Sequence, residues 1–284
     1  MSTFSTSADS GAPDRRDQIA FIGGGNMASA IIGGLIREGI PASKIDVIEP
    51  FAEARQRLDT EFGIAAEAAA GPMLKSAGLV VWAVKPQTFK EAAQQARPYT
   101  NQALHLSVAA GIRSDSIAQW LGTDAVVRTM PNTPALIGKG MAALFARPGV
   151  SAEGRELVER VIATTGEYLW VDQEDKLDAV TSLSGSGPAY VFYFLEAMTQ
   201  AGVEMGLTAA QAHQLAVGTF AGATELARSS SETPEVLRQR VTSKGGTTYA
   251  AITSMEQDNI KPAFMRALHA ARQRAAELGN EFGG

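Results

Sequence analysis

The sequence predicts an α/β fold, with a Rossmann-like, doubly wound, mainly parallel sheet at the N-terminus and an all-α domain after it. Two observations predict this order. Up to about residue 174, short apolar runs that end in glycine or proline alternate with amphipathic segments, as buried parallel strands alternate with their covering helices. From about residue 175, apolar residues recur at helical spacing almost to the end of the chain. We therefore expect a sheet domain at residues 18–174 and a helical domain at residues 175–284.

The individual elements follow one another without an internal repeat. Strands are expected at residues 19–22, 45–48, 79–84, 104–108, 126–129, 141–145 and 168–171. Helices between them are expected at residues 27–36, 53–62, 89–96, 114–121 and 152–164, with Ser114 as the N-cap of the fourth. In the helical domain, breaks are expected at Gly206, Pro234, Gly245, Gly246 and Pro262.

Composition excludes several classes of function. The chain of 284 residues has a net charge of −5, so neither nucleic acid nor a membrane is expected as a partner. It has no cysteine and three scattered histidines, which excludes disulfides and thiolate chemistry and leaves no metal site to expect. Residues 1–17 contain no apolar stretch of signal-peptide length, so we expect a disordered tail and a cytoplasmic protein.

The segment Gly23-Gly-Gly-Asn-Met-Ala28 fits the pattern G-x-G-x-x-A between the first strand and the first helix. Gly23 permits the tight turn, Gly25 lets the backbone approach a pyrophosphate, and Ala28 lets helix and strand pack closely. The new helix points its free N–H groups, at Asn26 and Met27, toward the phosphates. The pattern therefore predicts a site for NADH or NADPH, with a merely structural tight turn as the alternative.

Glu49 ends the second expected strand, about 21 residues after Ala28. An acid at this place usually bonds the ribose hydroxyls of NAD and would repel the 2′-phosphate of NADP. Two unit charges about 5 Å apart at an effective dielectric near 20 interact by about 3 kcal/mol, enough to influence the preference. Since Glu49 is expected to be able to rotate into water, and Arg55 lies within reach of a phosphate, the sequence favours NADH without settling the choice. The alternative is a solvated glutamate with no role.

Further strand ends are expected to face the same ligand, because ligands of such sheets lie beyond the carboxyl ends of the strands. Small residues follow the fourth strand and leave room for a dinucleotide, and the residues after the fifth strand are expected to line the nicotinamide pocket. These residues are Ala109, Ala110 and Gly111, and Met130, Pro131 and Asn132.

Five segments carry a resemblance to a known family. They are Phe21-Ile-Gly-Gly-Gly-Asn-Met-Ala28, Ala83-Val-Lys-Pro-Gln87, Val127-Arg-Thr-Met-Pro-Asn-Thr-Pro134, Gly185-Ser-Gly-Pro-Ala-Tyr190 and Val241-Thr-Ser-Lys-Gly-Gly-Thr-Thr248. With these motifs, in family order, the chain resembles the pyrroline-5-carboxylate reductases over nearly all of residues 18–280. Five ordered motifs are far more specific than the glycine turn alone.

The resemblance implies reduction of the cyclic imine 1-pyrroline-5-carboxylate to L-proline by NADPH or NADH, the last step of proline biosynthesis. It also implies a homodimer with intertwined helical domains, which can assemble further into a homodecamer, and a substrate that lies between the nicotinamide and the helical domain. Four more residues are implied to contact the cofactor. They are Ala83, Val84, Lys85 and Pro86.

The resemblance also assigns roles within residues 241–248. Thr248 is implied to be the catalytic residue, with its hydroxyl near the imine nitrogen. The substrate carboxylate is implied to bind Ser243, Gly245, Gly246 and Thr247, together with Thr248. From the residues alone, an ordinary helix start after a Gly-Gly turn remains the alternative. One residue departs from the pattern, because Lys244 stands where the family commonly has proline.

Two rival functions remain open on the sequence. One is another oxidoreductase of similar build that acts on a different imine or on a 3-hydroxy acid. The hydroxy-acid enzymes use a lysine on the first long helix of the second domain, and residues 188–206 contain none. The other is a non-enzymatic, nucleotide-sensing dimer, which the intact hydroxyl cluster of Ser243, Thr247 and Thr248 argues against.

Overall fold

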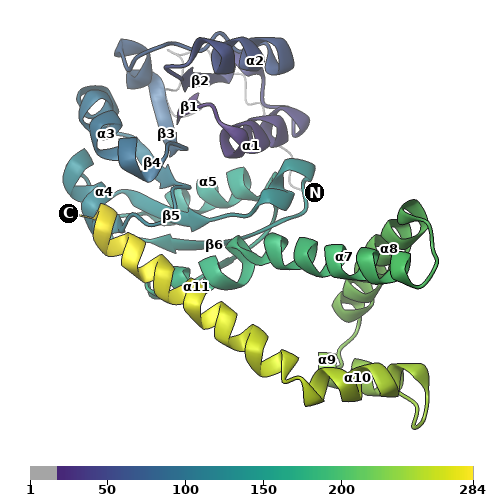
Figure 1. The fold of residues 1–284 in the computed structure, drawn as a ribbon. Coiled ribbons are helices and arrows are strands. Elements are labelled where there is room, and N and C mark those ends of the chain that lie inside the picture. Colours follow the sequence, from purple (N-terminus) through teal and green to yellow (C-terminus); the bar gives the residue numbers. More distant parts are fainter. Residues whose placement is uncertain (1–17, 284) are drawn as a thin grey trace. The chain divides into compact units, whose positions relative to one another are not determined.

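The computed structural model describes residues 18–283, and the predicted tail at residues 1–17 lies outside them. The described chain forms two compact units. The first contains the residues up to Gly185 together with those from Arg274 onward, and the second is Ser186–Gln273. The expected α/β architecture followed by helices is confirmed, as Figure 1 shows.

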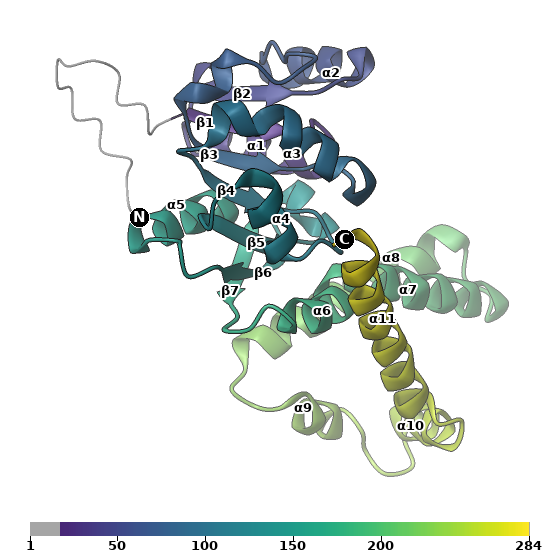
Figure 2. The same cartoon turned by 90° about the vertical axis from the view of Figure 1, so that its left-hand side faces the viewer.

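A seven-stranded sheet forms the centre of the first unit, with the strand order β2-β1-β3-β4-β5-β6-β7 (Figure 2). All neighbouring strands are parallel except β5 and β6, which are antiparallel, so the sheet is mainly parallel as predicted. The strands are β1 (Gln18–Ile22), β2 (Ile45–Ile48), β3 (Ala77–Trp82), β4 (Leu104–Ser107), β5 (Val126–Met130), β6 (Gly140–Ala146) and β7 (Gly166–Trp170).

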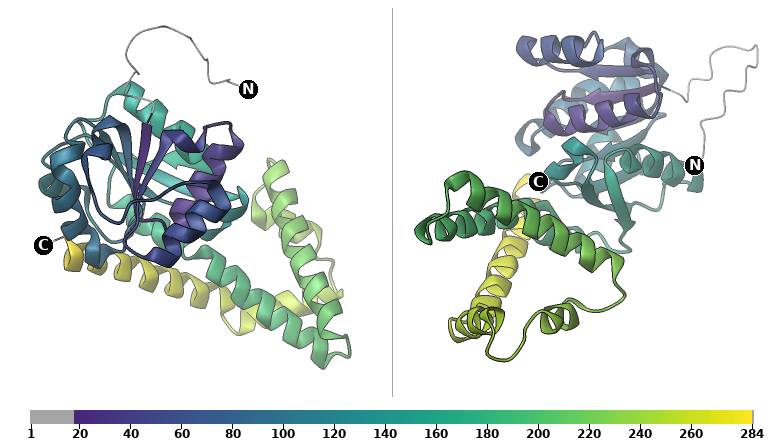
Figure 3. Two further views of the ribbon diagram at one scale, coloured as in Figure 1. Left: turned by 90° about the horizontal axis from the view of Figure 1, so that it is seen from above. Right: turned by 90° about the vertical axis from the view of Figure 1, so that its right-hand side faces the viewer.

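Helices cover both faces of this sheet (Figure 3). One face packs against α1 (Asn26–Arg37), α2 (Ala52–Phe62) and α5 (Ala152–Ala163), and the other against α3 (Pro86–Thr100) and α4 (Ser114–Leu121). Apolar side chains of the strands point alternately into the two layers. Phe21 joins the first layer and Ile22 the second, and both are almost fully buried. Short 3₁₀ turns are η2 (Ala42–Lys44), η3 (Pro72–Ser76) and η4 (Thr133–Ile137).

The second layer holds a buried aromatic group. Trp82 stacks on Phe89 and donates a hydrogen bond from Nε1 to Nδ1 of His105 at 3.0 Å. His105 is 1% exposed, and burial lowers its pKa to about 4. The imidazole is therefore neutral near pH 7 and serves as a hydrogen-bond acceptor in the core.

Two helices contain prolines that do not end them. Helix α3 was expected at residues 89–96 but continues through Pro98 to Thr100. Helix α11 (Ile260–Phe282) begins before Pro262 instead of breaking there. Pro262 lies in the first turn, where the missing N–H would have had no partner within the helix, so proline is tolerated.

The prediction that Ser114 is the N-cap of α4 was wrong. Arg113 holds the N-cap position without a side-chain cap, and Ser114 is the first helical residue. Its backbone N–H and its hydroxyl both donate to the carboxylate of Glu174, at 2.6 Å each. A distant acid therefore caps the helix in place of the local hydroxyl.

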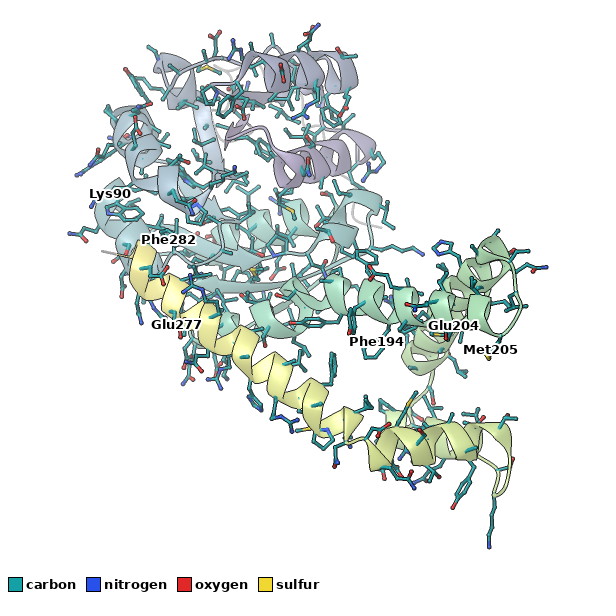
Figure 4. The ribbon with its side chains drawn as sticks, in the orientation of Figure 1. Lys90, Phe194, Glu204, Met205, Glu277 and Phe282 are labelled. Carbon is teal, nitrogen blue, oxygen red and sulfur yellow. The ribbon has the colours of Figure 1, made fainter. Side chains whose placement is uncertain are left out.

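The second unit consists of helices, as predicted. They are α7 (Gly187–Glu204), α8 (Ala209–Ser229), α9 (Pro234–Arg240), α10 (Thr247–Gln257) and the first part of α11. Tyr190 and Phe194 of α7 meet the ring of Phe264 edge-on (Figure 4 labels Phe194). Many large apolar side chains of this unit are exposed, such as Tyr193 at 69% and Met205 at 78%. A single copy of the unit therefore leaves apolar surface uncovered.

The segment that leads from the sheet into the helical unit has a shape the sequence did not predict. Helix α6 (Lys176–Val180) continues directly into a π-helical turn, η5 (Thr181–Gly185). Such turns are rare and occur often at functional sites. None of the described helices is both long enough and apolar enough to cross a membrane.

Candidate functional site

The carboxyl ends of four neighbouring parallel strands meet at one edge of the sheet. The strands are β1, β3, β4 and β5, which lie side by side in this order. Most predicted cofactor and nicotinamide contacts of the first unit lie at these ends, and Glu49 and Arg55 follow the adjacent strand β2. The topology therefore brings these separate segments to one edge, where the ligands of such sheets bind.

Gly23 begins the turn after β1 and has a positive φ of 98°. A Cβ at this position would lie 2.5 Å from the carbonyl oxygen of Ala83, closer than real contacts allow. The N–H of Gly23 also donates to the carbonyl of Ile48 at 2.8 Å. The turn is thus locked between the ends of β2 and β3, and only glycine fits at this place.

Gly25 differs from Gly23 in what surrounds it. A Cβ there would meet no atom within 4 Å, so the face of the backbone at this residue is open. Gly25 is the N-cap of α1, and no side chain satisfies the N–H groups of the first turn, which begins with the exposed Asn26. Ala28 is fully buried against the sheet. Free donors beside open space are what a pyrophosphate requires.

Glu49 is fixed, which corrects the expectation that it rotates into water. Its side chain accepts the N–H of Gly24 on Oε2 at 2.8 Å and the N–H of Phe51 on Oε1 at 2.9 Å. The residue is 6% exposed. Arg55 donates from Nη1 to the carbonyls of Glu49 and Pro50. The glutamate thus uses the amide of Gly24, and the N–H groups left for a phosphate begin at Gly25.

The segment after β3 leads directly into α3. Ala83 and Val84 are half-buried, whereas Lys85 is exposed at the N-cap position of α3 and Pro86 opens the helix. The backbone of Ala83 is the surface on which the glycine turn rests. A contact between Lys85 and a ligand stays a prediction.

The small residues after β4 have a packing role in addition to the predicted one. Gly111 has a φ of 71°, and a Cβ there would lie 3.0 Å from the Cβ of Leu278 near the end of α11. Ala109 is buried and Ala110 half-buried. The positive φ and the close approach of the helix both favour glycine here, and the close passage of a dinucleotide at these residues stays a prediction.

The residues after β5 contact the π-helical turn η5. Asn132 donates from Nδ2 to the carbonyl of Ser184 at 3.1 Å and accepts the N–H of Met141 on Oδ1 at 2.9 Å. A Cβ on Gly185 would lie 2.4 Å from the Cε of Met130. Pro131 is buried. The amide of Asn132 therefore positions this loop, whether or not it also contacts a ligand.

In the second unit, the residues from Ser243 to Thr248 form the turn before α10 and its first two residues. Gly245 has a φ of 76°, and Gly246 is the N-cap without any side-chain cap. A Cβ on Gly246 would lie 2.7 Å from the Oγ of Ser243. Lys244 and Thr247 are exposed, and Thr248 is half-buried. Hydroxyls and uncapped N–H groups are thus gathered at one helix end, an arrangement suited to a carboxylate.

One residue near the predicted contacts was missed by sequence reasoning. Glu174 binds Ser114 and also accepts Nη1 of the buried Arg128 at 2.6 Å. No local sequence pattern could reveal this network, because Glu174 lies 46 positions from Arg128 and 60 positions from Ser114. Among the described residues, no three acidic or histidine side chains gather in a way that would hold a metal ion.

Comparisons with known proteins agree with this organisation. Residues 174–278 match the family described as pyrroline-5-carboxylate reductase dimerisation, and residues 18–111 match the family described as NADP oxidoreductase, coenzyme F420-dependent. A pyrroline-5-carboxylate reductase of Pseudomonas aeruginosa is 44% identical over 268 residues, which are 94% of this chain and 98% of that protein.

Solved structures agree as well. A pyrroline-5-carboxylate reductase of Coxiella burnetii has a TM-score of 0.86 at 36% identity, covering 92% of this chain and 98% of that one. The Plasmodium falciparum pyrroline carboxylate reductase, solved with NADP bound, has a TM-score of 0.84 at 25% identity and covers 93% and 99% of the two chains.

The open face at Gly25 leads to a prediction. In Gly25→Ala the new methyl group projects into empty space, so the thermal unfolding temperature should stay within about 2 °C of the parent. The same methyl group would stand where a pyrophosphate approaches, so the Kd of NADH should rise about tenfold or more. Thermal unfolding and a fluorescence titration measure the two effects. An unchanged Kd would contradict the assignment of Gly25 to the phosphate site.

Proposed function

Because the chain belongs to the pyrroline-5-carboxylate reductase family, an NAD(P)-dependent family of oxidoreductases, we propose that it reduces 1-pyrroline-5-carboxylate to L-proline in proline biosynthesis. The single observation that carries the proposal is the 44% identity that extends over 94% of the chain. We assign dinucleotide binding to residues 18–174 and substrate binding together with dimerisation to residues 175–284.

The first unit fits a nicotinamide dinucleotide. The uncapped N–H groups at the start of α1 lie beside the open face of Gly25 and would hold the pyrophosphate. Ala83 to Pro86, Ala109 to Gly111 and Pro131 at the neighbouring strand ends would support the rest of the molecule. When bound, the dinucleotide supplies a hydride to the carbon of the imine.

The chemistry asks little acid–base catalysis of the protein. A protonated cyclic imine is already electrophilic, so hydride addition at carbon gives the secondary amine without a further proton transfer in the same step. The chain's task is to hold the ring against the hydride donor and to exclude water. Met130 and Asn132 would line the nicotinamide side of this space.

The start of α10 is the proposed seat of the substrate carboxylate. Its N–H groups have no side-chain cap, and the helix dipole favours an anion there. Ser243, Gly245, Gly246 and Thr247 would bind the carboxylate, and the hydroxyl of Thr248 would lie near the ring nitrogen. Lys244 adds a positive charge next to this seat.

Self-association is supported by the match of residues 174–278 to the dimerisation family and by the exposed apolar side chains of the second unit. We further propose a homodimer that can assemble into a homodecamer, located in the cytoplasm. Light scattering on the purified protein measures the copy number, and subcellular fractionation tests the location. A single copy in solution, or recovery of the protein outside the cytoplasm, would contradict the respective part.

The proposed reaction has a direct test. Purified protein should oxidise NADH or NADPH only when 1-pyrroline-5-carboxylate is added, and L-proline should form in equal amount. Absorbance of the reduced nicotinamide and chromatography of the product measure the two. If neither dinucleotide is consumed, the reductase assignment fails and a nucleotide-sensing dimer becomes the better account.

Loss of the hydroxyl at position 248 should affect turnover more than cofactor binding. In Thr248→Ala we expect kcat to fall about 100-fold, because a hydrogen-bond donor near the reacting nitrogen is lost. The Kd of NADH should change less than about twofold, since Thr248 belongs to the second unit. Steady-state kinetics and a binding titration measure these effects. Thr248→Ser keeps the hydroxyl and serves as the matched control; an unchanged kcat in Thr248→Ala would remove the residue from the mechanism.

We propose that NADH is the preferred cofactor, because the carboxylate of Glu49 is held by two backbone amides and cannot turn away from a 2′-phosphate. The ratio of kcat/KM for NADH over NADPH should exceed one, and Glu49→Ser should lower it about tenfold. Some loss of affinity for both cofactors should accompany the change, since the amide of Gly24 loses its acceptor. Equal kcat/KM values in the parent would show that Glu49 does not discriminate.

A further inference from the structure

The chain passes between its two compact units twice, once after Gly185 and once after Gln273. On the side of the first unit, both passages are held by the same short stretch, residues 111–116. This stretch begins at Gly111, the last of the predicted cofactor contacts after β4. One place in the first unit therefore contacts both passages.

The segment that leads to the first passage is held at Glu174, just before α6. Its Oε1 accepts the backbone N–H of Ser114 and Nη1 of Arg128, each at 2.6 Å, and its Oε2 accepts the hydroxyl of Ser114 at 2.6 Å. Arg147 in turn donates to the oxygen of Ser114 at 3.2 Å. An ion pair of Arg113 with Asp178 in α6, at 3.6 Å, adds a second contact between the same segments.

These contacts are charged and largely removed from water. The side chain of Arg128 is 8% exposed and that of Glu174 is 16% exposed. The carboxylate also lies at the positive end of α4, where a negative charge is stabilised. Charge-assisted hydrogen bonds in such surroundings are stronger and better oriented than those at the surface. Glu174 therefore fixes the start of the first passage with respect to α4 and β5.

The second passage is held by apolar and backbone contacts. Leu278 lies against Gly111, and Gly279 packs close to the side chain of Arg113. The hydroxyl of Ser116 donates to the carbonyl of Gly283 at 2.6 Å, and Phe282 packs against the core layer of α3 and α4. The end of α11 (Figure 4 labels Phe282) is thus part of the first unit.

We propose that residues 111–116 couple occupancy of the dinucleotide site to the two passages, and that Glu174 is the positioning residue of this coupling. A ligand that orders the loop after β4 also orders the start of α4. Because Glu174 is bonded to Ser114 there, the segment that leads into the helical unit becomes more ordered as well. Contiguous networks of hydrogen bonds and ion pairs carry coupling of this kind, and the bonds that join Ser114, Glu174 and Arg128 form such a network. The proposal rests on the proposed function for its ligand and its reaction.

Hydrogen exchange with NADH or NADPH alone tests the coupling without any turnover. In the full-length parent, the dinucleotide should slow amide exchange about twofold or more at residues 23–28, 111–116, 172–180 and 274–283. In Glu174→Gln the slowing at residues 23–28 should persist, while that at residues 172–180 should be lost. Asp172→Asn is the matched control, because Asp172 is an exposed acid of the same segment that pairs with Lys176 and not with Ser114 or Arg128. It should behave like the parent.

The kinetic arm separates positioning from mere stability. Glu174→Gln should lower kcat about tenfold while the Kd of NADH changes less than about twofold, because hydride transfer is sensitive to small misplacements and the phosphate site is untouched. Ser114→Ala removes the bonds of the hydroxyl to Glu174 and Arg147, and its effect on kcat should not add to that of Glu174→Gln. If Glu174→Gln does not fold, Ser114→Ala alone carries both arms.

The outcomes are distinct. Slowing at residues 23–28 without slowing at residues 172–180 in the parent overturns the coupling and leaves the proposed function intact. A lower unfolding temperature of Glu174→Gln with unchanged kcat and an unchanged exchange pattern also overturns it. No slowing anywhere with either dinucleotide overturns both proposals.

Discussion

The contact between the backbone of Gly23 and the carbonyl of Ala83 is the constraint on which the candidate site depends. Because no Cβ separates them, the turn after β1 lies directly on the end of β3, and its amide reaches the carbonyl of Ile48 at the end of β2. Three strand ends are thereby held together by the main chain alone. The uncapped start of α1 projects from this support, so its donors are oriented before any ligand arrives.

Two carboxylates, the buried Glu49 and the half-buried Glu174, perform related tasks at either end of the first unit's ligand edge. Glu49 binds the amides of Gly24 and Phe51, and Glu174 binds the amide and hydroxyl of Ser114. Glu49 holds the glycine turn, which is predicted to face the dinucleotide, and Glu174 holds the start of α4, which follows the predicted contacts after β4. The uncapped N–H groups of α1 and α10 and the hydroxyls near the start of α10 remain available to bind ligands. This arrangement suits a reaction in which the substrate is already charged and electrophilic.

Local pattern was sufficient for the seven strands, the glycine turn and the change to helices, because each depends on the periodicity of neighbouring residues. Local pattern failed where a residue far away in the sequence determines the local structure. Ser114 has the side chain of an N-cap, yet the carboxylate of Glu174, 60 positions away, takes that role. The orientation of Glu49 was missed for a related reason, since its acceptors are satisfied by amides that only the folded turn brings near.

Prolines show the same limit in another form. Pro262 was expected to break a helix and lies inside α11, and α3, which was expected to end at residue 96, continues through Pro98. Their effect depends on whether a carbonyl one turn earlier needs a donor, which local composition does not reveal. The residues from Ser243 to Thr248 were assigned by resemblance to a family, and from spacing alone they are equally an ordinary helix start.

The last turns of α11 have a consequence for how the chain folds during synthesis. Leu278 and Phe282 complete the packing of the first unit, yet the ribosome produces them only after the whole helical unit. The nascent sheet must therefore wait with part of its apolar surface unfilled, although domains usually fold in the order in which they emerge. The first unit therefore cannot complete its core until residue 282 has been synthesised. A polypeptide interrupted earlier lacks part of the packing of that core.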